Sequence, residues 1–158
     1  MRLDFATAWR DCNCLAVRQA ARHVTRFYDQ LLAPSGVRAT QFSILSRLDR
    51  TGAMPINALA AALVMDRTTL GRNILPLERD GLIEIVAASA DRRRREVRLT
   101  DAGTARLAEA RQAWAFAQVR FEEVFGKDRA AALRDLLHAV SASDFTTVPD
   151  ADTGGATS

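Results

Sequence analysis

The sequence predicts a mainly α-helical protein with one small β-hairpin. Over most of the chain, apolar residues recur at steps of three and four, which is the period of an amphipathic helix. Between residues 82 and 99 this pattern gives way to two short runs of β-forming residues on either side of an arginine-rich stretch. A chain of 158 residues is long enough to bury a real core around these elements.

The composition excludes several classes of protein. Nearly half of the residues are hydrophobic (48%), yet no apolar run approaches the ~20 residues that a membrane-spanning helix needs. Residues 1–9 lack the apolar segment and cleavage site of a signal peptide. Two cysteines, Cys12 and Cys14, lie too close together to build a disulfide framework, which fits a reducing compartment. We therefore expect a soluble, cytoplasmic protein with no membrane partner.

The first predicted helix spans Leu15 to Leu32 and ends at the Pro34-Ser35-Gly36 turn. Its apolar stripe consists of Val17, Ala21, Val24, Tyr28 and Leu31. Thr40 is the expected N-cap of a second helix, which runs through Leu48. The inward side of that second helix is predicted to carry Ile44, Leu45 and Leu48.

A turn at residues 52–55 separates the second helix from a short third helix, Ile56 to Leu63. Asp66 is the expected N-cap of a fourth helix, which ends at Gly81 in the C′ position. The inward stripe of the fourth helix is Leu70, Ile74 and Leu77. Pro76 removes a backbone donor and crowds the carbonyl group of Arg72, so a kink or a weakening is expected there.

The second half of the chain begins with the hairpin. Residues 82–87 form the first predicted strand, residues 89–95 the arginine-rich tip and residues 96–99 the returning strand. Thr100 with Asp101 opens a long fifth helix, Gly126 ends it and Asp128 opens a sixth. The apolar stripe of the fifth helix is Leu107, Ala110, Trp114, Ala117, Phe121 and Val124. The polar tail, residues 146–158, is expected to be disordered.

Two short helices joined by a tight turn and followed by a hairpin describe a winged helix-turn-helix, here residues 38–100. This region carries 11 Arg against 7 Asp and Glu, whereas the rest of the chain has a net charge of −1. With its apolar stripe inward, the fourth helix turns Thr68, Arg72 and Arg79 outward, with Arg67, Thr69 and Asn73 on the flanks. Arginine and asparagine read guanine and adenine edges in the major groove, and threonine contacts phosphates or thymine methyl groups.

The arginine-rich tip fits the same interpretation. Beside a recognition helix, a basic hairpin enters the adjacent minor groove or clamps the phosphates next to it. The alternative is a solvated loop without a partner. We expect the tip to contact DNA, because it belongs to a hairpin next to a helix whose outward face is itself basic.

The stretch MDRTTLGRNILPLERDGLIE, the Asp-Arg wing and VRLTDAG together resemble the MarR family of bacterial winged-helix transcription factors. The resemblance extends from residue 12 to about residue 145. It implies a homodimer in which residues 1–37 and 101–145 form the dimerisation helices and residues 38–100 bind DNA. It also implies that each subunit places its recognition helix in the major groove and a wing arginine in the minor groove, with Asp91 orienting that arginine.

The predicted DNA-binding set follows from the helix face and from this resemblance. Asp91 and Arg93 match the first acid and the first arginine of the family's wing pattern, whereas Arg94 replaces its second acid. Which of Arg93, Arg94 and Arg95 enters the groove therefore stays open. The full set comprises Arg38, Thr40, Gln41, Arg67, Thr68, Thr69, Arg72, Asn73, Arg92, Arg93, Arg94 and Arg95.

The terminal helices are also rich in aromatic residues: Phe27, Tyr28, Trp114, Phe116, Phe121 and Phe125. This is more aromatic surface than a compact DNA-binding head can cover, and a helical dimer interface would bury it. The alternative is that these rings belong to the core of a single chain.

The resemblance further implies a regulator that leaves DNA when a small aromatic acid binds, or when a cysteine is oxidised. For the first route the candidate effector residues are Arg18, Arg22 and His23. For the second, Cys14 resembles in position the reactive cysteine of the branch that senses organic hydroperoxides, although Arg18 stands where that branch has a tyrosine. Alternatively, Cys12 and Cys14 are small buried residues. They could also be metal ligands, but the sequence offers no third ligand near them.

Two other classes of function fit the sequence less well. An enzyme would need a catalytic constellation, and the sequence has no P-loop, no G-x-S-x-G motif and no spaced His-carboxylate set. A protein-interaction module would need a neutral, apolar recognition face. We therefore expect a non-enzymatic, homodimeric repressor of a pseudo-palindromic operator, with no catalytic residues, metal or cofactor.

Overall fold

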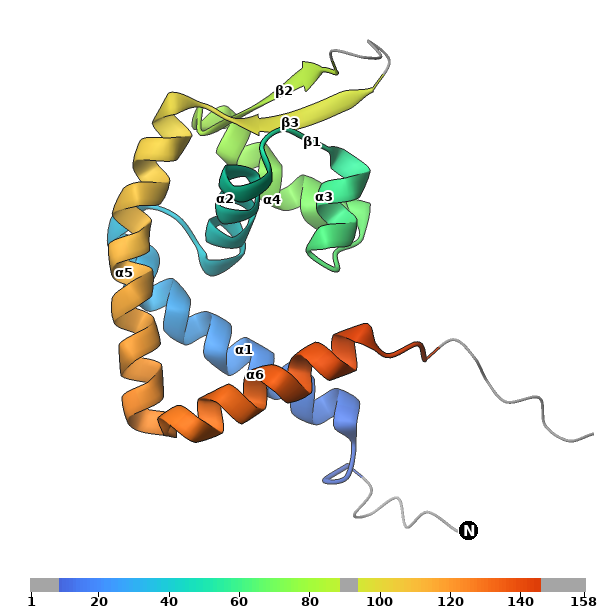
Figure 1. The fold of residues 1–158 in the computed structure, drawn as a ribbon, viewed down its shortest axis with the longest axis vertical. Coiled ribbons are helices and arrows are strands. Elements are labelled where there is room, and N and C mark those ends of the chain that lie inside the picture. The colour runs from blue at the N-terminus through green and yellow to red at the C-terminus, as the bar shows by residue number, and fades with distance from the viewer. Residues whose placement is uncertain (1–8, 89–93, 146–158) are drawn as a thin grey trace, which may run out of the picture. The chain divides into compact units, whose positions relative to one another are not determined.

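The structure, a computed structural model, describes residues 9–88 and 94–145 and comprises two compact units. The first runs up to Gln118 and holds α1 to α4, the sheet and most of α5, while the second begins at Val119 and holds the end of α5 and α6 (Figure 1). The predicted fold class, mainly helical with a small antiparallel hairpin, is confirmed. None of the helices in the described part of the chain is long and apolar enough to cross a membrane.

The predicted helices and strands are all present, with shifts of a few residues at their ends. In chain order the elements are α1 (Asn13–Leu32), the 3-10 turn η1 (Ala33–Ser35), α2 (Ala39–Thr51), β1 (Met54–Pro55), α3 (Ile56–Ala62), α4 (Arg67–Arg79), β2 (Ile83–Ala87), β3 (Arg95–Leu99), α5 (Asp101–Phe125) and α6 (Lys127–Ala142).

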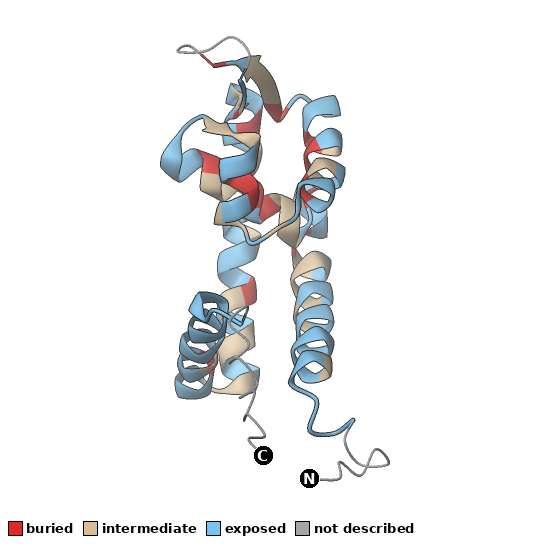
Figure 2. Ribbon diagram, turned by 90° about the vertical axis from the view of Figure 1, so that its right-hand side faces the viewer, coloured by how far each residue is buried: buried red, intermediate tan, exposed pale blue. Residues whose placement is uncertain are grey.

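The core of the first unit lies between α2, α4, the sheet and the first half of α5. Figure 2 shows the buried residues concentrated in this part of the unit. The inward stripes predicted for α2 and α4 are confirmed, because Ile44, Leu45, Leu48, Leu70, Ile74 and Leu77 are all buried. Each such side chain contributes roughly 1.5–3 kcal/mol of hydrophobic stabilisation.

The predicted stripe of α5 is only partly correct. Leu107, Ala110 and Ala117 are fully buried, but Trp114 stays 37% exposed and Val124 stays 73% exposed. One face of the Trp114 indole is covered by the ring of Phe42, since the two rings stack at 5.7 Å between centroids. Tyr28 is half-buried and donates a hydrogen bond to Oε1 of Gln118 at 2.8 Å. Some of the terminal aromatic residues therefore pack within the chain, whereas Phe116 remains 62% exposed.

The sheet has three strands in the order β1-β3-β2, all antiparallel. Val97 pairs with Ile85 on one side and with Met54 on the other, so the hairpin is joined to the residues that precede α3. Sequence reasoning did not predict β1. This strand is only two residues long and contains Pro55, which is tolerated on an edge strand but gives no alternating pattern.

Three helix starts differ from the prediction. Helix α2 begins at Ala39 rather than after Thr40, because Gln41 Oε1 accepts the N–H of Arg38 at 2.9 Å and Asp29 Oδ1 accepts the N–H of Ala39 at 2.7 Å. These two acceptors satisfy donors that a Thr40 cap would have left free. Helix α1 begins two residues earlier than predicted and α6 one residue earlier, directly after Gly126 at φ +97°.

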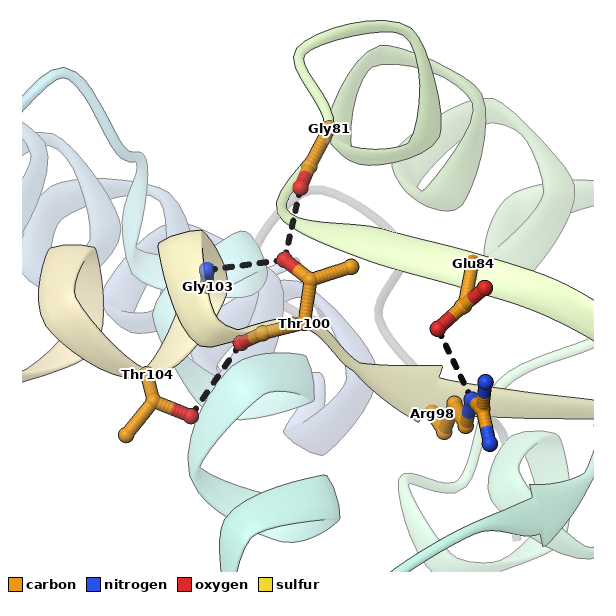
Figure 3. A network of polar contacts seen from close by, with 6 residues as sticks. All are labelled: Gly81, Glu84, Arg98, Thr100, Gly103 and Thr104. Atoms are coloured by element: carbon orange, nitrogen blue, oxygen red, sulfur yellow. Dashed lines mark hydrogen bonds and ion pairs between the residues drawn. The ribbon is translucent and has the colours of Figure 1, made fainter.

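The junction between the sheet and α5 fixes the hairpin against the end of α4 (Figure 3). As predicted, Thr100 opens α5, because its hydroxyl oxygen accepts the N–H of Gly103 at 3.0 Å. The same hydroxyl group donates to the carbonyl oxygen of Gly81 at 2.6 Å. Gly81 follows α4 with φ +70°, in the left-handed conformation that glycine adopts after a helix. The end of the fourth helix and the start of the fifth are therefore held by one side chain.

Candidate nucleic-acid interface

Helix α4 presents a polar, basic surface along its first two turns. The side chains of Arg67, Thr68, Thr69 and Arg72 are exposed, and Asn73 is half-exposed. Among the residues that the structure describes, Arg67, Thr68 and Arg72 make no side-chain hydrogen bond or ion pair. Their donor groups are therefore available to a ligand from outside.

Asp66 caps this helix. Its carboxylate accepts the hydroxyl group of Thr69 at 2.6 Å and the N–H of Thr69 at 2.8 Å. The Thr69 hydroxyl and then the Thr69 N–H lower the pKa of Asp66 below its ordinary value of 3.8. Asn73 Nδ2 donates to the carbonyl oxygen of Thr69 at 2.8 Å, which leaves the Asn73 amide oxygen free to accept. The cap fixes the start of the helix and orients Thr69 and Asn73.

The helix continues through Pro76 to Arg79. The expected weakening is limited to one ladder bond, because proline has no N–H to donate to the carbonyl group of Arg72. Leu75 stands on the same outward stripe as Thr68, Arg72 and Arg79 and is 61% exposed. Sequence reasoning placed no apolar residue on this stripe.

A cleft of about 470 Å³ lies between the start of α4, the start of α3 and the wing. Arg67 comes from α4, and Arg94 and Arg95 come from the wing. None of the described residues that line the cleft is acidic; the others are Pro55, Ile56, Asn57 and Ala58. The pairing of β1 with β3 brings the first residues of α3 to the cleft. Sequence reasoning missed Asn57 because it did not predict this pairing.

The other wing residues that the structure describes do not point to DNA in the same way. Arg98 is neutralised, because its Nε donates to Glu84 Oε1 at 2.8 Å across the hairpin (Figure 3). Ala88 N–H donates to the carbonyl oxygen of Arg94 at 2.8 Å, which extends the ladder by one pair toward the tip. The predicted wing residues Asp91, Arg92 and Arg93 lie outside the described residues.

Not all of the predicted DNA-binding residues gather in one place. Arg38 and Gln41, at the start of α2, line a different groove together with Pro76 and Arg79 at the end of α4. Thr40 is half-buried in the first turn of α2. The cleft near the wing is lined by Arg67, Arg94 and Arg95. Arg38, Thr40 and Gln41 do not line it.

The candidate sensing residues lie along α1. Cys12 and Cys14 are both exposed in the single chain, so neither is buried within it. Cys12 Sγ accepts the N–H of Leu15 at 3.4 Å and caps the helix. The candidate effector residues Arg18, Arg22 and His23 are exposed, and Arg22 lines a hollow together with Ala21, Thr25, Arg26 and Asp29. Within the described ranges, no cluster of three potential metal ligands is found.

Comparison with known proteins finds a matching family model and several similar solved structures. The model of the MarR family matches residues 37–94. The M. tuberculosis transcriptional regulator MosR, solved in complex with DNA, is 34% identical, with 83% of this chain and 97% of that chain covered and a TM-score of 0.70. The transcriptional repressor CouR was solved bound to a 23-mer DNA duplex (27% identity, 89% and 99% covered, TM-score 0.76) and to p-coumaroyl-CoA (26% identity, 90% and 100% covered, TM-score 0.75). No curated protein matches the chain.

Proposed function

Because the chain belongs to the MarR family of DNA-binding transcriptional regulators, we propose that it is a homodimeric repressor that a small aromatic or phenolic ligand releases from a pseudo-palindromic operator. The observation that carries the DNA-binding part is the cleft beside the exposed polar face of α4, whose described lining residues include three arginines and no acidic residue. A surface of this kind attracts a phosphate backbone and releases its counterions.

In this proposal the two parts of the surface have different tasks. Arg72 and Asn73 reach base edges in the major groove, since their side chains carry donors and an acceptor of the right kind. Arg67, Arg94 and Arg95 hold the phosphates between the recognition helix and the wing. The solved complexes of MosR and CouR with DNA support this assignment by similarity.

Dimerisation is supported by apolar side chains that the single chain leaves exposed. In the second unit these are Val119, Val124, Leu136, Leu137, Val140 and Phe145. In α1 of the first unit, Val17 and Ala21 of the predicted stripe are exposed as well. Apolar faces of this extent on helices that a family uses for assembly favour a subunit interface.

The dimer is tested by sedimentation equilibrium. The double variant Leu136→Arg/Val140→Arg places two charges on the exposed apolar stripe of α6 and is expected to shift the mass from dimer to monomer. Ala131→Arg is the matched control, because Ala131 is exposed on the opposite side of the same helix. A dimer that persists unchanged in the double variant would contradict the assignment of this face.

A second candidate trigger is oxidation of Cys14. It is favoured by one observation: both thiols are exposed at the start of α1, where an oxidant can reach them. The ligand route remains the first choice, since CouR, a repressor of the same fold, was solved bound to p-coumaroyl-CoA.

One titration tests the function and separates the two triggers. Fluorescence anisotropy follows binding to the DNA upstream of the protein's own gene, first reduced, then with cumene hydroperoxide and separately with aromatic carboxylates. Release by peroxide that thiol reverses and that Cys14→Ser, but not Cys12→Ser, abolishes would establish the redox trigger. Release by a carboxylate alone would establish the ligand trigger. No binding at any salt concentration would overturn the repressor.

A further inference from the structure

Gly71 stands in the middle of the recognition helix α4, and the packing of the described chain gives no reason for a glycine there. Its backbone is helical, since Gly71 is not among the glycines with a positive φ. A Cβ atom placed on it meets no heavy atom of the described residues within 4 Å. Glycine inside a helix is less favourable than alanine, so the missing side chain is a cost to the fold. A glycine at such a position lets a partner from outside approach the backbone closely.

Leu75, one turn further along α4, is an apolar residue that stays 61% exposed. Residues four apart in a helix lie on the same side, so Leu75 follows Gly71 along one stripe of α4. Because helical side chains lean toward the N-terminus, the side chain of Leu75 borders the turn that holds Gly71 and Arg72. We call Gly71 and Leu75 together the apolar notch, in which bare backbone forms the floor and the Leu75 side chain forms one wall.

The surroundings of the apolar notch are basic. Arg67 lies one turn before Gly71 on the same side of α4 and is exposed. It lines the cleft near the wing together with Arg94 and Arg95. Arg72, directly after Gly71, is exposed as well. A partner that fits the notch therefore combines negative charge with a small apolar group. The major groove of DNA offers both, because the C5 methyl group of thymine lies there between the two phosphate backbones.

We propose that the apolar notch reads a thymine of the operator, with the C5 methyl group against the backbone of Gly71 and the side chain of Leu75. This rests on the proposed function and names the base that the middle of α4 recognises. The notch adds an apolar contact to the polar contacts assigned to Arg72 and Asn73. Cytosine has no methyl group at C5 and would leave the notch unfilled, so the notch selects thymine over cytosine.

The contact is tested by fluorescence anisotropy on two duplexes of the upstream DNA, one with thymine and one with deoxyuridine at every thymine position. Uracil keeps the hydrogen-bonding groups of thymine and lacks only the methyl group. The wild type is expected to bind the uracil duplex about fourfold more weakly for each thymine contact, which is the effect of exposing one buried methyl group. Leu75→Ala is expected to lose affinity for the thymine duplex and to lose little more on the uracil duplex.

Gly71→Ala supplies the reciprocal variant, because it adds a methyl group to the helix where uracil removes one from the DNA. It is expected to bind the thymine duplex more weakly than the wild type by about fourfold or more, and to recover affinity on the uracil duplex. Alanine favours the helix at this open position, so a loss of binding here does not come from a loss of fold. Val64→Ala is the matched control: it trims an exposed aliphatic residue in the turn before α4 and is expected to keep both affinities.

Equal affinity of the wild type for the two duplexes would overturn the thymine contact. An unchanged preference for thymine in Leu75→Ala or in Gly71→Ala would overturn the notch as its site, as would an equal loss in Val64→Ala. In each of these cases, tighter binding to the upstream DNA than to a scrambled duplex would leave the repressor model intact. Absence of binding to every duplex at low salt would overturn the repressor model and the thymine contact together.

Discussion

The hydroxyl group of Thr100 donates a hydrogen bond of 2.6 Å to the carbonyl oxygen of Gly81 (Figure 3). This bond joins the residue before α5 to the turn that follows the recognition helix α4. Because the same oxygen caps α5 through the N–H of Gly103, one side chain satisfies two backbone groups. The wing strands, α4 and the start of α5 are thereby held in one arrangement.

Replacing Thr100 by valine is expected to lower the free energy of unfolding by about 1–2 kcal/mol, since the helix cap and the bond to Gly81 are lost together. Thr100→Ser keeps the hydroxyl group and is expected to stay close to the wild type. Urea unfolding of both variants at one protein concentration measures the difference. Equal stability of the valine and serine variants would show that the hydroxyl group contributes nothing.

Gly103 cannot carry a side chain. A Cβ atom placed on it would lie 1.9 Å from the carbonyl oxygen of Leu82, which is backbone and cannot move aside freely. Gly103→Ala is therefore expected to cost at least about 2 kcal/mol. Gly71→Ala is the control, because nothing lies within 4 Å of its Cβ position and alanine favours the helix by up to about 1 kcal/mol. Thermal unfolding should move the two melting temperatures in opposite directions; a stable Gly103→Ala variant would contradict the close packing.

Val64 has a left-handed backbone, φ +52°, in the turn between α3 and α4, and its side chain is 80% exposed. A β-branched residue is strained in this region, and its exposed methyl groups gain little by packing. Val64→Gly is expected to stabilise the chain by about 1 kcal/mol, which corresponds to a rise in melting temperature of about 2–4 °C. Val64→Ala, which also removes apolar surface but keeps a Cβ, is expected to gain less. A lower melting temperature for the glycine variant would argue against strain.

The cap of α4 predicts an acid-dependent contribution to stability. Since the hydrogen bonds from Thr69 lower the pKa of Asp66 below 3.8, the folded state favours the charged carboxylate. This contribution is present above the ordinary value of 3.8 and is lost as the pH falls through the lower value of the folded state. In Asp66→Asn the residue caps the helix but does not titrate. The difference in urea midpoint between wild type and variant should change only below pH 3.8, and a constant difference would contradict the shift.

The sequence predicted the helices, the hairpin and the inward stripes of α2 and α4, because these depend on local periodicity and on strong caps such as Asp66. It failed where the structure depends on contacts between distant segments. The strand β1 exists only because Met54 and Pro55 pair with β3, and this pairing brings Asn57 to the basic cleft. The start of α2 is set by Asp29, a residue of another helix, rather than by Thr40. The separation of Arg38 and Gln41 from the cleft near the wing likewise depends on how α1, α2 and α4 pack.

In the proposed function, the exposed polar face of α4 contacts base edges, while the cleft near the wing binds phosphates. The most direct test is fluorescence anisotropy over a salt series, on the upstream DNA and on a scrambled duplex, for the wild type, Arg72→Ala and Arg94→Ala/Arg95→Ala. The wing variant is expected to weaken binding to both duplexes and to flatten the salt slope by nearly one unit for each lost phosphate contact. Arg72→Ala is expected to lose about 1–3 kcal/mol on the upstream DNA alone. An unchanged slope in the wing variant, together with equal losses on both duplexes for Arg72→Ala, would contradict the account.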